Sequence, residues 1–357
     1  MASYKLFELL KDLKEKGGSD LHLSAGSPPR MRIGGKLLSV GEKLLDAEEA
    51  KNMCLEKMES KTHQHFEETG EADFSFGVEG VARFRVNVYL EKSSTAGAFR
   101  ILPWQVPTPE ALKLPPKITE LTEKKQGLIL VTGATGSGKS STIASLIELI
   151  NQSRPDHIMT IEDPIEFVFN HKQSMVHQRE VGTHTSDFKT ALKYILRQDP
   201  DVVLIGEMRD LETIQAAITT AETGHLVFAT LHTNTSVQTV DRIIDVFPAS
   251  QQPQVRSQLS FILEAVLSQQ LIPMKDGSRE LALEMLFPNY AIRNLIREGK
   301  NHQIYSQMQT GQEETGMQTM NQCLFKMLKE GKIDAKLGRL YSPMAQEWDE
   351  MLGRKRA

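Results

Sequence analysis

The eight residues GATGSGKS at positions 133–140 restrict the possible fold more than any other part of this chain. They match the pattern G-x-x-x-x-G-K-[ST] and follow the apolar run Leu128–Val131. The segment after them has apolar residues at i, i+3, i+4 and i+7 from Ile143, which predicts a helix. A glycine-rich turn between a buried strand and a helix brings backbone N–H groups close to a phosphate. The motif therefore predicts a nucleotide-phosphate site in an α/β fold.

The side chains of this motif predict its ligands. Lys139 is placed to reach the β- and γ-phosphates, and the Ser140 hydroxyl to ligate Mg²⁺, so ATP and Mg²⁺ are the expected cofactors. The glycine spacing differs from G-x-G-x-x-G, which disfavours a dinucleotide-binding fold. The predicted nucleotide-binding residues are Gly133, Ala134, Thr135, Gly136, Ser137, Gly138, Lys139, Ser140 and Ser141.

Three further apolar runs follow the motif, with segments of helical character between them. They are Ile158–Ile161, Val202–Ile205 and Leu226–Ala229. Near-continuous apolar strands that alternate with helices indicate a parallel sheet covered on both faces.

Polar residues stand at the ends of these runs. Glu162 follows the first run, Gly206 and Glu207 follow the second, and His225 and His232 flank the third. The second run resembles a Walker B strand, although Gly206 stands where an Asp is usual. Any one of these segments could be a solvated strand end. All three in order after the phosphate motif indicate a site that holds Mg²⁺ or orients water.

The character of the chain changes near residue 103. The segment VARFRVNVYL at 81–90 alternates apolar residues with Arg83 and Arg85, which predicts a strand with one buried face. Five prolines within 103–116 are incompatible with a helix interior or a sheet centre, and predict a semi-rigid linker. The predicted domains are an N-terminal α+β domain at 1–102, a proline-rich linker at 103–116, an α/β core at 117–288 and a helical C-terminal region at 289–357.

Composition narrows the functional classes. The chain has 357 residues, a net charge of -4 and two cysteines. Two cysteines cannot form a four-cysteine zinc site, so no zinc is expected. The net charge is mildly negative, so it gives no sign of the basic surface that binds nucleic acid. Nucleic acid is therefore not an expected partner. The sequence shows neither a signal-peptide core nor an apolar run of membrane-spanning length, so a cytoplasmic protein is expected.

Longer segments carry a family resemblance. TIEDPIE at 160–166, QREVGTHTSDF at 178–188, LRQDPDVVLIGEMRD at 196–210 and TAETGHLVFATLHTN at 220–234 resemble the secretion ATPase superfamily, which powers type II secretion and type IV pili. Near the C-terminus, AIRNLIREGK at 291–300, HQIYSQMQTG at 302–311 and GMQTMNQ at 316–322 resemble the pilus retraction ATPases.

The resemblance implies an architecture and a function. It implies a RecA-like P-loop ATPase core with a small PAS-like N-terminal domain and a helical C-terminal part. It implies a homohexameric motor ring that hydrolyses ATP to retract type IV pili, which drives twitching motility. The implied partner is the inner-membrane platform of the pilus machine, so the implied location is the cytoplasmic side of the pilus base.

The resemblance also implies roles for particular residues. Lys139 and Ser140 form the Walker A pair, and Glu162 resembles the carboxylate that activates water. Glu207 occupies the Walker B position and acts on Mg²⁺ through water, while His225 and His232 couple nucleotide state to the subunit interface. Candidate arginine contacts to nucleotide are Arg83, Arg85, Arg100, Arg197 and Arg209. The retraction motif comprises Ala291, Ile292, Arg293, Asn294, Leu295, Ile296 and Arg297.

Some alternatives stay open. Asn321 stands where the family commonly has Asp, which puts details of ring contacts in doubt. The chain could be a paralogous accessory retraction ATPase, or a pilus extension or type II secretion ATPase. From other classes come a RecA-like DNA translocase, which a DNA-stimulated ATPase rate would favour, and a nucleotide-sensing scaffold that binds ATP without turnover.

Overall fold

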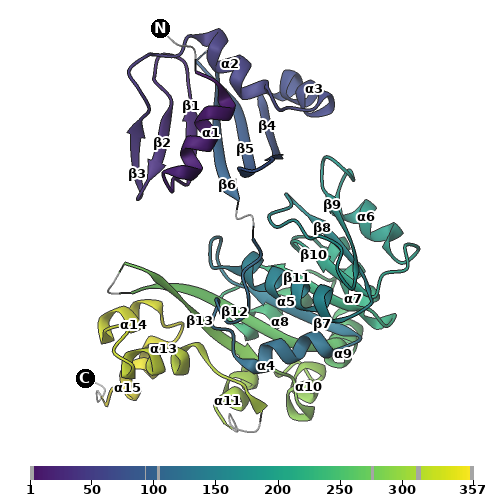
Figure 1. Cartoon of the computed structure of the whole chain (residues 1–357). Coiled ribbons are helices and arrows are strands. Elements are labelled where there is room, and N and C mark those ends of the chain that lie inside the picture. Colours follow the sequence, from purple (N-terminus) through teal and green to yellow (C-terminus); the bar gives the residue numbers. More distant parts are fainter. Residues whose placement is uncertain (1–3, 93, 103–104, 275–276, 311–314, 354–357) are drawn as a thin grey trace. The chain divides into compact units, whose positions relative to one another are not determined.

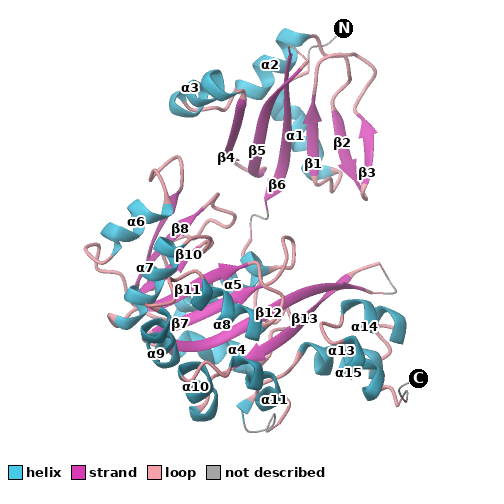
Figure 2. Ribbon diagram, turned by 180° about the vertical axis from the view of Figure 1, so that it is seen from behind, coloured by secondary structure: helices cyan, strands magenta, loops and turns pink. Residues whose placement is uncertain are grey.

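The computed structural model describes residues 4–92, 94–102, 105–274, 277–310 and 315–353. The chain divides into two compact units, one of residues 1–105 with 164–168 and one of the remainder. Each unit contains its own β-sheet, as Figures 1 and 2 show. Pro103 and Trp104 of the predicted linker lie outside the described residues. Within the described ranges, no helix combines the length and the hydrophobicity that a membrane crossing requires.

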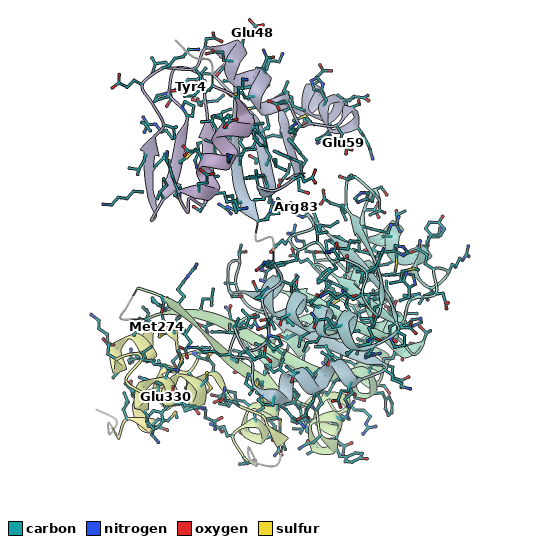
Figure 3. All side chains as sticks on the ribbon, in the orientation of Figure 1. Tyr4, Glu48, Glu59, Arg83, Met274 and Glu330 are labelled. Carbon is teal, nitrogen blue, oxygen red and sulfur yellow. The ribbon has the colours of Figure 1, made fainter. Side chains whose placement is uncertain are left out.

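The first unit is an antiparallel six-stranded sheet with the order β3-β2-β1-β6-β5-β4, accompanied by three helices. In β5, Phe84 and Val86 are buried with the helices, while Arg83 and Arg85 lie on the opposite face, as the alternation predicts. Figure 3 labels Arg83 on this strand. The elements are α1 (Leu6–Glu15), β1 (Asp20–Leu23), β2 (Arg30–Ile33), β3 (Lys36–Ser39), α2 (Ala47–Leu55), α3 (Ser60–Thr69), β4 (Glu71–Val78), β5 (Ala82–Glu91) and β6 (Ser94–Leu102).

The second unit is a seven-stranded sheet with the order β13-β12-β7-β11-β10-β8-β9. The predicted parallel strands are confirmed, because β7, β11, β10 and β8 pair in parallel. The elements are α4 (Pro116–Thr119), η1 (Glu120–Glu123), β7 (Gly127–Thr132), α5 (Lys139–Ser153), β8 (His157–Glu162), β9 (Met175–Glu180), α6 (Phe188–Ile195), β10 (Val202–Ile205), α7 (Leu211–Glu222), β11 (Leu226–Leu231), α8 (Ser236–Asp245), α9 (Gln252–Ile262), β12 (Leu263–Pro273) and β13 (Arg279–Leu286).

The β12–β13 hairpin was not predicted from the sequence. β12 pairs in parallel with β7, and β13 pairs antiparallel with β12, which makes the sheet mixed. The polar residues Ser268, Gln269 and Gln270 interrupt the apolar run of β12 and hide its strand character. Two of them are nevertheless buried, since Ser268 and Gln269 are at most 1% exposed.

The C-terminal part is mostly helical, as predicted. Three of its helices pack on the β12–β13 hairpin around Trp348, which is fully buried with Ile272 and Ala282 of the two strands. Figures 1 and 2 both show these helices gathered beside that hairpin. The elements are α10 (Tyr290–Arg297), η2 (Asn301–Gln303), α11 (Ile304–Met308), α13 (Met320–Lys329), α14 (Ala335–Tyr341) and α15 (Ala345–Met351).

The surroundings of Asn321 suit an amide. This side chain is fully buried and donates to Glu347 Oε2 at 2.7 Å and to the Met344 carbonyl at 3.0 Å. Its own oxygen accepts from the Ser342 hydroxyl at 2.6 Å. An aspartate would place a second carboxylate against Glu347 and lose both donated bonds. Asn321 is therefore matched to its neighbours in this chain.

Glu284 of β13 is a fully buried carboxyl between two helix N-termini. It accepts from the backbone N–H of Ser236 at 2.6 Å and of Met320 at 3.3 Å. Burial raises its pKa above the ordinary 4.5 and the charge of Glu347 adds to the shift, while the two N–H donors oppose it.

We expect this raised pKa to make stability depend on pH. A carboxyl whose pKa is raised in the folded state contributes stability below its unfolded value of 4.5, and loses it as pH rises through the folded value. The thermal unfolding midpoint of the wild type should therefore fall relative to that of Glu284→Gln as pH rises from 4 toward neutrality. Paired melting curves across this range measure the difference, and a constant difference would contradict the assignment.

Candidate functional site

The phosphate motif forms a tight loop between β7 and α5. Gly133, Gly136 and Gly138 adopt positive φ values of 139°, 78° and 91°, which side-chain-bearing residues rarely adopt. At Gly133 an added Cβ would also lie 2.4 Å from the Gln269 carbonyl oxygen, so the loop begins where only glycine fits. Helix α5 starts at Lys139. The first N–H groups of a helix that follows such a loop point toward the side of the loop where a phosphate binds.

Lys139 lies over the loop that it follows. Its Nζ donates to the carbonyl oxygens of Gly133 at 2.8 Å and Ala134 at 3.0 Å. The positive charge is therefore held at the loop, where the motif predicts the phosphates. Ser140, in the same first turn of α5, is only partly exposed.

Glu207 follows β10 and is the centre of a charged cluster. Its carboxylate pairs with Arg209 at 2.6 Å and with His232 Nε2 at 3.0 Å. Burial favours the neutral carboxyl, but the hydrogen bond from Arg209 and the charges of Arg209, His232 and Lys139 outweigh it, so the pKa of Glu207 is lowered. Because β7, β11 and β10 pair in parallel, Glu207 and the phosphate loop leave the same edge of the sheet.

Glu162 ends the neighbouring strand β8. Its Oε1 accepts from the Thr160 hydroxyl at 2.6 Å and from Gln178 Nε2 at 3.1 Å. These two donors are neutral and fix the direction of the carboxylate. Since β8 and β10 pair in parallel, Glu162 and Glu207 leave the same edge of the sheet.

The glycine at the usual Asp position has a steric reason. The Gly206 N–H donates to the Ile161 carbonyl at 2.8 Å, and its own carbonyl accepts from the Thr230 hydroxyl at 2.5 Å. An added Cβ would lie 3.0 Å from the Ile161 oxygen and 3.2 Å from the Glu162 Cα. Both are backbone atoms, so a side chain here would push the end of β10 away from Glu162.

We expect Gly206→Asp, which restores the usual Walker B residue, to inactivate this chain. The shift that the Cβ forces would misplace Glu162 relative to the phosphate loop, and a misplacement near 1 Å can cost on the order of 10²-fold in rate. Steady-state ATPase assays measure the loss. Gly77→Ala is the matched control, because its Cβ would meet nothing within 4 Å. Wild-type turnover by Gly206→Asp would contradict the steric argument.

Two of the predicted residues lie at the other edge of the sheet. His225 precedes β11, and its Nδ1 lies 3.0 Å from the Thr220 carbonyl oxygen and 3.1 Å from the Thr223 hydroxyl. The six residues of β11 separate it from His232 by roughly 20 Å. Arg197 similarly precedes β10. Within one chain, the structure does not bring His225 or Arg197 to Glu207.

The arginines of the first unit are held by neighbouring strands. Arg85 pairs with Asp73 at 2.7 Å, and Arg100 pairs with Asp20 at 2.8 Å. Arg83 donates to the Ser75 hydroxyl at 2.5 Å. Cross-strand register therefore orders these three guanidinium groups on one face, and their contact with nucleotide stays a prediction.

The retraction motif forms helix α10, with Ile292 and Ile296 buried beneath it. Arg293 and Arg297 are four residues apart, which places them on one side of a helix, but they make different contacts in the structure. Arg293 donates to the carbonyl oxygens of Ser260 and Phe261 at 2.8 Å and to Glu264 at 2.9 Å, so it fastens α10 to the end of α9. Arg297 lies over the Phe261 ring at 5.7 Å.

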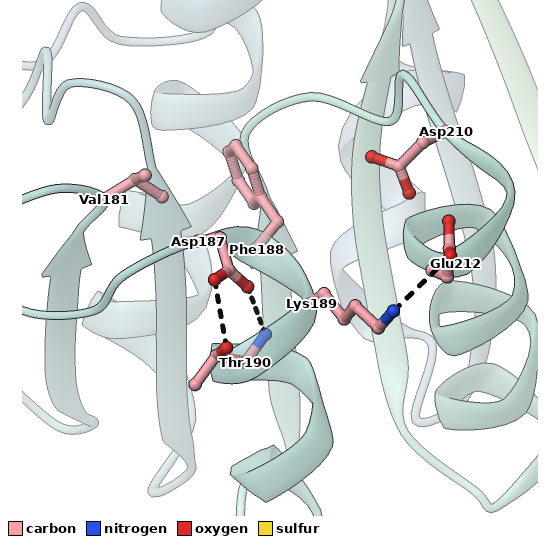
Figure 4. A pocket seen from close by; sticks show the side chains of 7 residues that line it. All are labelled: Val181, Asp187, Phe188, Lys189, Thr190, Asp210 and Glu212. Atoms are coloured by element: carbon pink, nitrogen blue, oxygen red, sulfur yellow. Dashed lines mark hydrogen bonds and ion pairs between the residues drawn. The ribbon is translucent and has the colours of Figure 1, made fainter.

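A pocket of about 340 Å³ lies between the starts of α6 and α7, near the loop that follows Gly206. Figure 4 shows its lining, with Asp187 turned back onto the start of α6 and Lys189 reaching Glu212 at 3.4 Å. Asp187 and Asp210 each cap their own helix, so their carboxylates are already used by backbone N–H groups. We assign no ligand to this pocket.

Sequence reasoning missed residues that support the site through hydrogen bonds: Thr160 and Gln178 donate to Glu162, Thr230 donates to the Gly206 carbonyl, and Gln269 donates to Thr142. Thr160 could have been found, because it shares the face of Glu162 two residues earlier on the same strand. Gln178 and Thr230 come from other strands, and only the sheet order brings them in. Gln269 had no local signal, because the polar residues Ser268, Gln269 and Gln270 hid the strand that places it.

The family comparison agrees with this geometry. A family model described as type II/IV secretion system protein matches residues 112–333. The type IV pilus retraction ATPase PilT of Pseudomonas aeruginosa is 47% identical over 93% of this chain and 96% of its own length. The type IV pilus ATPase PilU of the same organism is 40% identical over 91% of this chain and 85% of its own length.

A solved structure is similar over almost the whole chain. The crystal structure of the pilus retraction motor PilT with bound ADP has a TM-score of 0.92 and 52% identity, and the match covers 98% of this chain and 100% of that one. The RecA-type core, the small N-terminal α+β domain and the helical C-terminus are thus confirmed as the fold class. The chain therefore belongs to the type II/IV secretion system protein family, and within it to the type IV pilus retraction ATPases.

Proposed function

We propose that this chain is the subunit of a motor that hydrolyses ATP to withdraw pilin from the base of a type IV pilus. The observation that carries the proposal is the meeting of the phosphate loop, Glu162 and Glu207 at one sheet edge, in a chain that matches a retraction motor with bound ADP over nearly its full length. Twitching motility is the expected cellular output.

In the proposed mechanism, the phosphate loop binds and orients the nucleotide. Backbone N–H groups of the loop and the start of α5 hold the phosphates, and Lys139 moves from the Gly133 and Ala134 carbonyls onto the β- and γ-phosphates. This places a positive charge where negative charge develops during transfer.

Mg²⁺ is the proposed metal, because the available donors suit it. The Ser140 hydroxyl would ligate the ion directly and the Glu207 carboxylate would hold it through water, and oxygen is the ligand type that Mg²⁺ prefers. The lowered pKa of Glu207 keeps that carboxylate ionised at neutral pH. When bound, the ion would neutralise charge on the β- and γ-phosphates. Arg209 and His232 would hold the carboxylate in place beside it.

Glu162 is the proposed residue that positions the attacking water. The Thr160 hydroxyl and the Gln178 amide hold one oxygen of the carboxylate. Glu162 would accept a proton from water in line with the γ-phosphate. His232, on the same cluster as Glu207, would report the state of the site to a neighbouring subunit.

The assembly and its partner are also proposed. We infer a homohexameric ring whose N-terminal arginines act on nucleotide and whose α10 helix takes part in coupling. The ring would lie at the cytoplasmic side of the inner membrane, against the platform of the pilus machine. Light scattering of the purified chain with ATP measures the stoichiometry.

Gene deletion with complementation tests the cellular function. Cells without the gene should carry excess surface pili and lose twitching, and the wild-type gene should restore both while a Lys139→Ala gene should not. Cells that instead lose their pili would identify an extension motor. Restoration only in a host that contains another retraction ATPase would identify an accessory, PilU-type role.

A further inference from the structure

Strand β12 places an amide against the phosphate loop. Gln269 is 1% exposed, and its Nε2 donates to Thr142 Oγ1 at 2.8 Å. Thr142 is equally buried and belongs to the first turn of α5, which also carries Lys139 and Ser140. The side chain of Gln269 therefore ties the beginning of the phosphate-binding helix to a neighbouring strand.

The backbone of the same residue touches the other end of the loop. Register pairs Ser268 with Thr132, the last residue of β7, and their hydroxyls lie 2.9 Å apart. Gln269 thus lies beside Gly133, where its carbonyl oxygen would be 2.4 Å from an added Cβ. One residue consequently contacts both the first position of the loop and the helix turn that closes it.

Burying this amide costs free energy, and packing alone does not explain why an amide occupies the position. Gln269 Oε1 and the Ser137 hydroxyl of the loop are buried and have no hydrogen-bond partner among the described residues. Buried polar atoms are nearly always paired, so a methionine or leucine would fill this position of an apolar strand more favourably. The bond to Thr142 is the feature that only an amide provides here.

We propose that Gln269 is a positioning residue of the phosphate site, which holds the first turn of α5 and the loop in register through Thr142. Phosphate recognition needs hydrogen-bond donors that are held within about 0.5 Å of their productive positions. Residues behind the loop must hold those donors in place. Gln269 fixes the helix relative to the sheet, and the helix carries Lys139 and Ser140. The inference rests on the proposed ATPase site and adds a residue that no sequence motif contains.

The test compares four variants at this contact. Gln269→Met keeps the volume and removes the donor, while Thr142→Val removes the acceptor with little change in shape. Each should lower kcat/KM for ATP by about tenfold, without lowering the thermal midpoint. Because both substitutions remove the same hydrogen bond, kcat/KM of the double variant should be no lower than that of either single variant. Thr142→Ser, which retains the hydroxyl, should recover most of the activity.

Gln270→Met is the control, because it changes the next residue of the same strand and should leave turnover unaltered. Wild-type kcat/KM in Gln269→Met would overturn the proposal, and so would additive losses in the double variant. If Gln269→Met fails to fold, the proposal is tested by comparing kcat/KM for ATP between Thr142→Val and Thr142→Ser, and equal values would overturn it. Lys139→Ala is assayed in parallel. Full activity in that variant would refute the ATPase site itself, whereas its loss beside a normal Gln269→Met refutes only this inference.

Discussion

Replacing Lys139 by alanine is expected to lower kcat for ATP hydrolysis by on the order of 10²–10³-fold, which corresponds to about 3–4 kcal/mol of transition-state stabilisation. The Lys139 ammonium is held at the loop by the carbonyls of Gly133 and Ala134. It is therefore positioned before nucleotide arrives and needs little reorganisation to meet the γ-phosphate. Its removal leaves the developing charge to the backbone N–H groups, the metal and the proposed arginine contacts.

The measurement is steady-state turnover together with nucleotide affinity. Lys117→Ala is a matched control, since it removes an exposed lysine that pairs with Glu120 on the surface at 2.7 Å. The control should turn over ATP at the wild-type rate. Unchanged turnover in Lys139→Ala would exclude the phosphate role of the loop, and an unfolded variant would be detected by its melting curve.

The sequence predicted the centre of the second unit because strong local patterns coincide there. The buried strands β7, β10 and β11 read as apolar runs, and Glu162, Glu207 and His232 stand at or just after the ends of β8, β10 and β11. A parallel sheet brings the ends of such strands to one edge. Glu162 and Glu207 could therefore be placed together without coordinates.

The remaining features depend on contacts that are distant in sequence. The hairpin of β12 and β13 was hidden because its buried polar residues, Ser268 and Gln269, serve partners more than a hundred residues away in Thr132 and Thr142. Periodicity reports which face is apolar, so it cannot identify a buried amide that is paired across the fold. The fastening of α10 by Arg293 has the same origin, since its acceptors lie in α9 and β12.

The two carboxylates of the site should have separable roles. Glu207 is paired with Arg209 and His232, which lower its pKa against the effect of burial, so it is held in the ionised form that binds a cation. Glu162 ends the neighbouring strand β8, in the segment that resembles the family's water-activating carboxylate. We therefore expect proton acceptance from Glu162 and charge-based binding from Glu207.

Glu162→Gln is accordingly expected to lower turnover by about 10²–10⁴-fold while ATP affinity stays near that of the wild type. The amide keeps an oxygen that can accept from Thr160 and Gln178, so the shape of the site is retained and only the proton acceptor is lost. Single-turnover hydrolysis and nucleotide titration measure the two quantities separately. Glu207→Gln should instead weaken metal-dependent binding, because its partner charges are left uncompensated.

A carboxylate outside the cluster provides the comparison. Glu212→Gln removes a half-exposed group that pairs with Lys189 at 3.4 Å, and it should leave both quantities unchanged. If Glu162→Gln turned over normally while Glu207→Gln bound ATP and failed to hydrolyse it, the two assignments would have to be exchanged. Because Glu162 and Glu207 end adjacent parallel strands, either result places the proton acceptor at the same sheet edge. Only the carboxylate that accepts the proton would change.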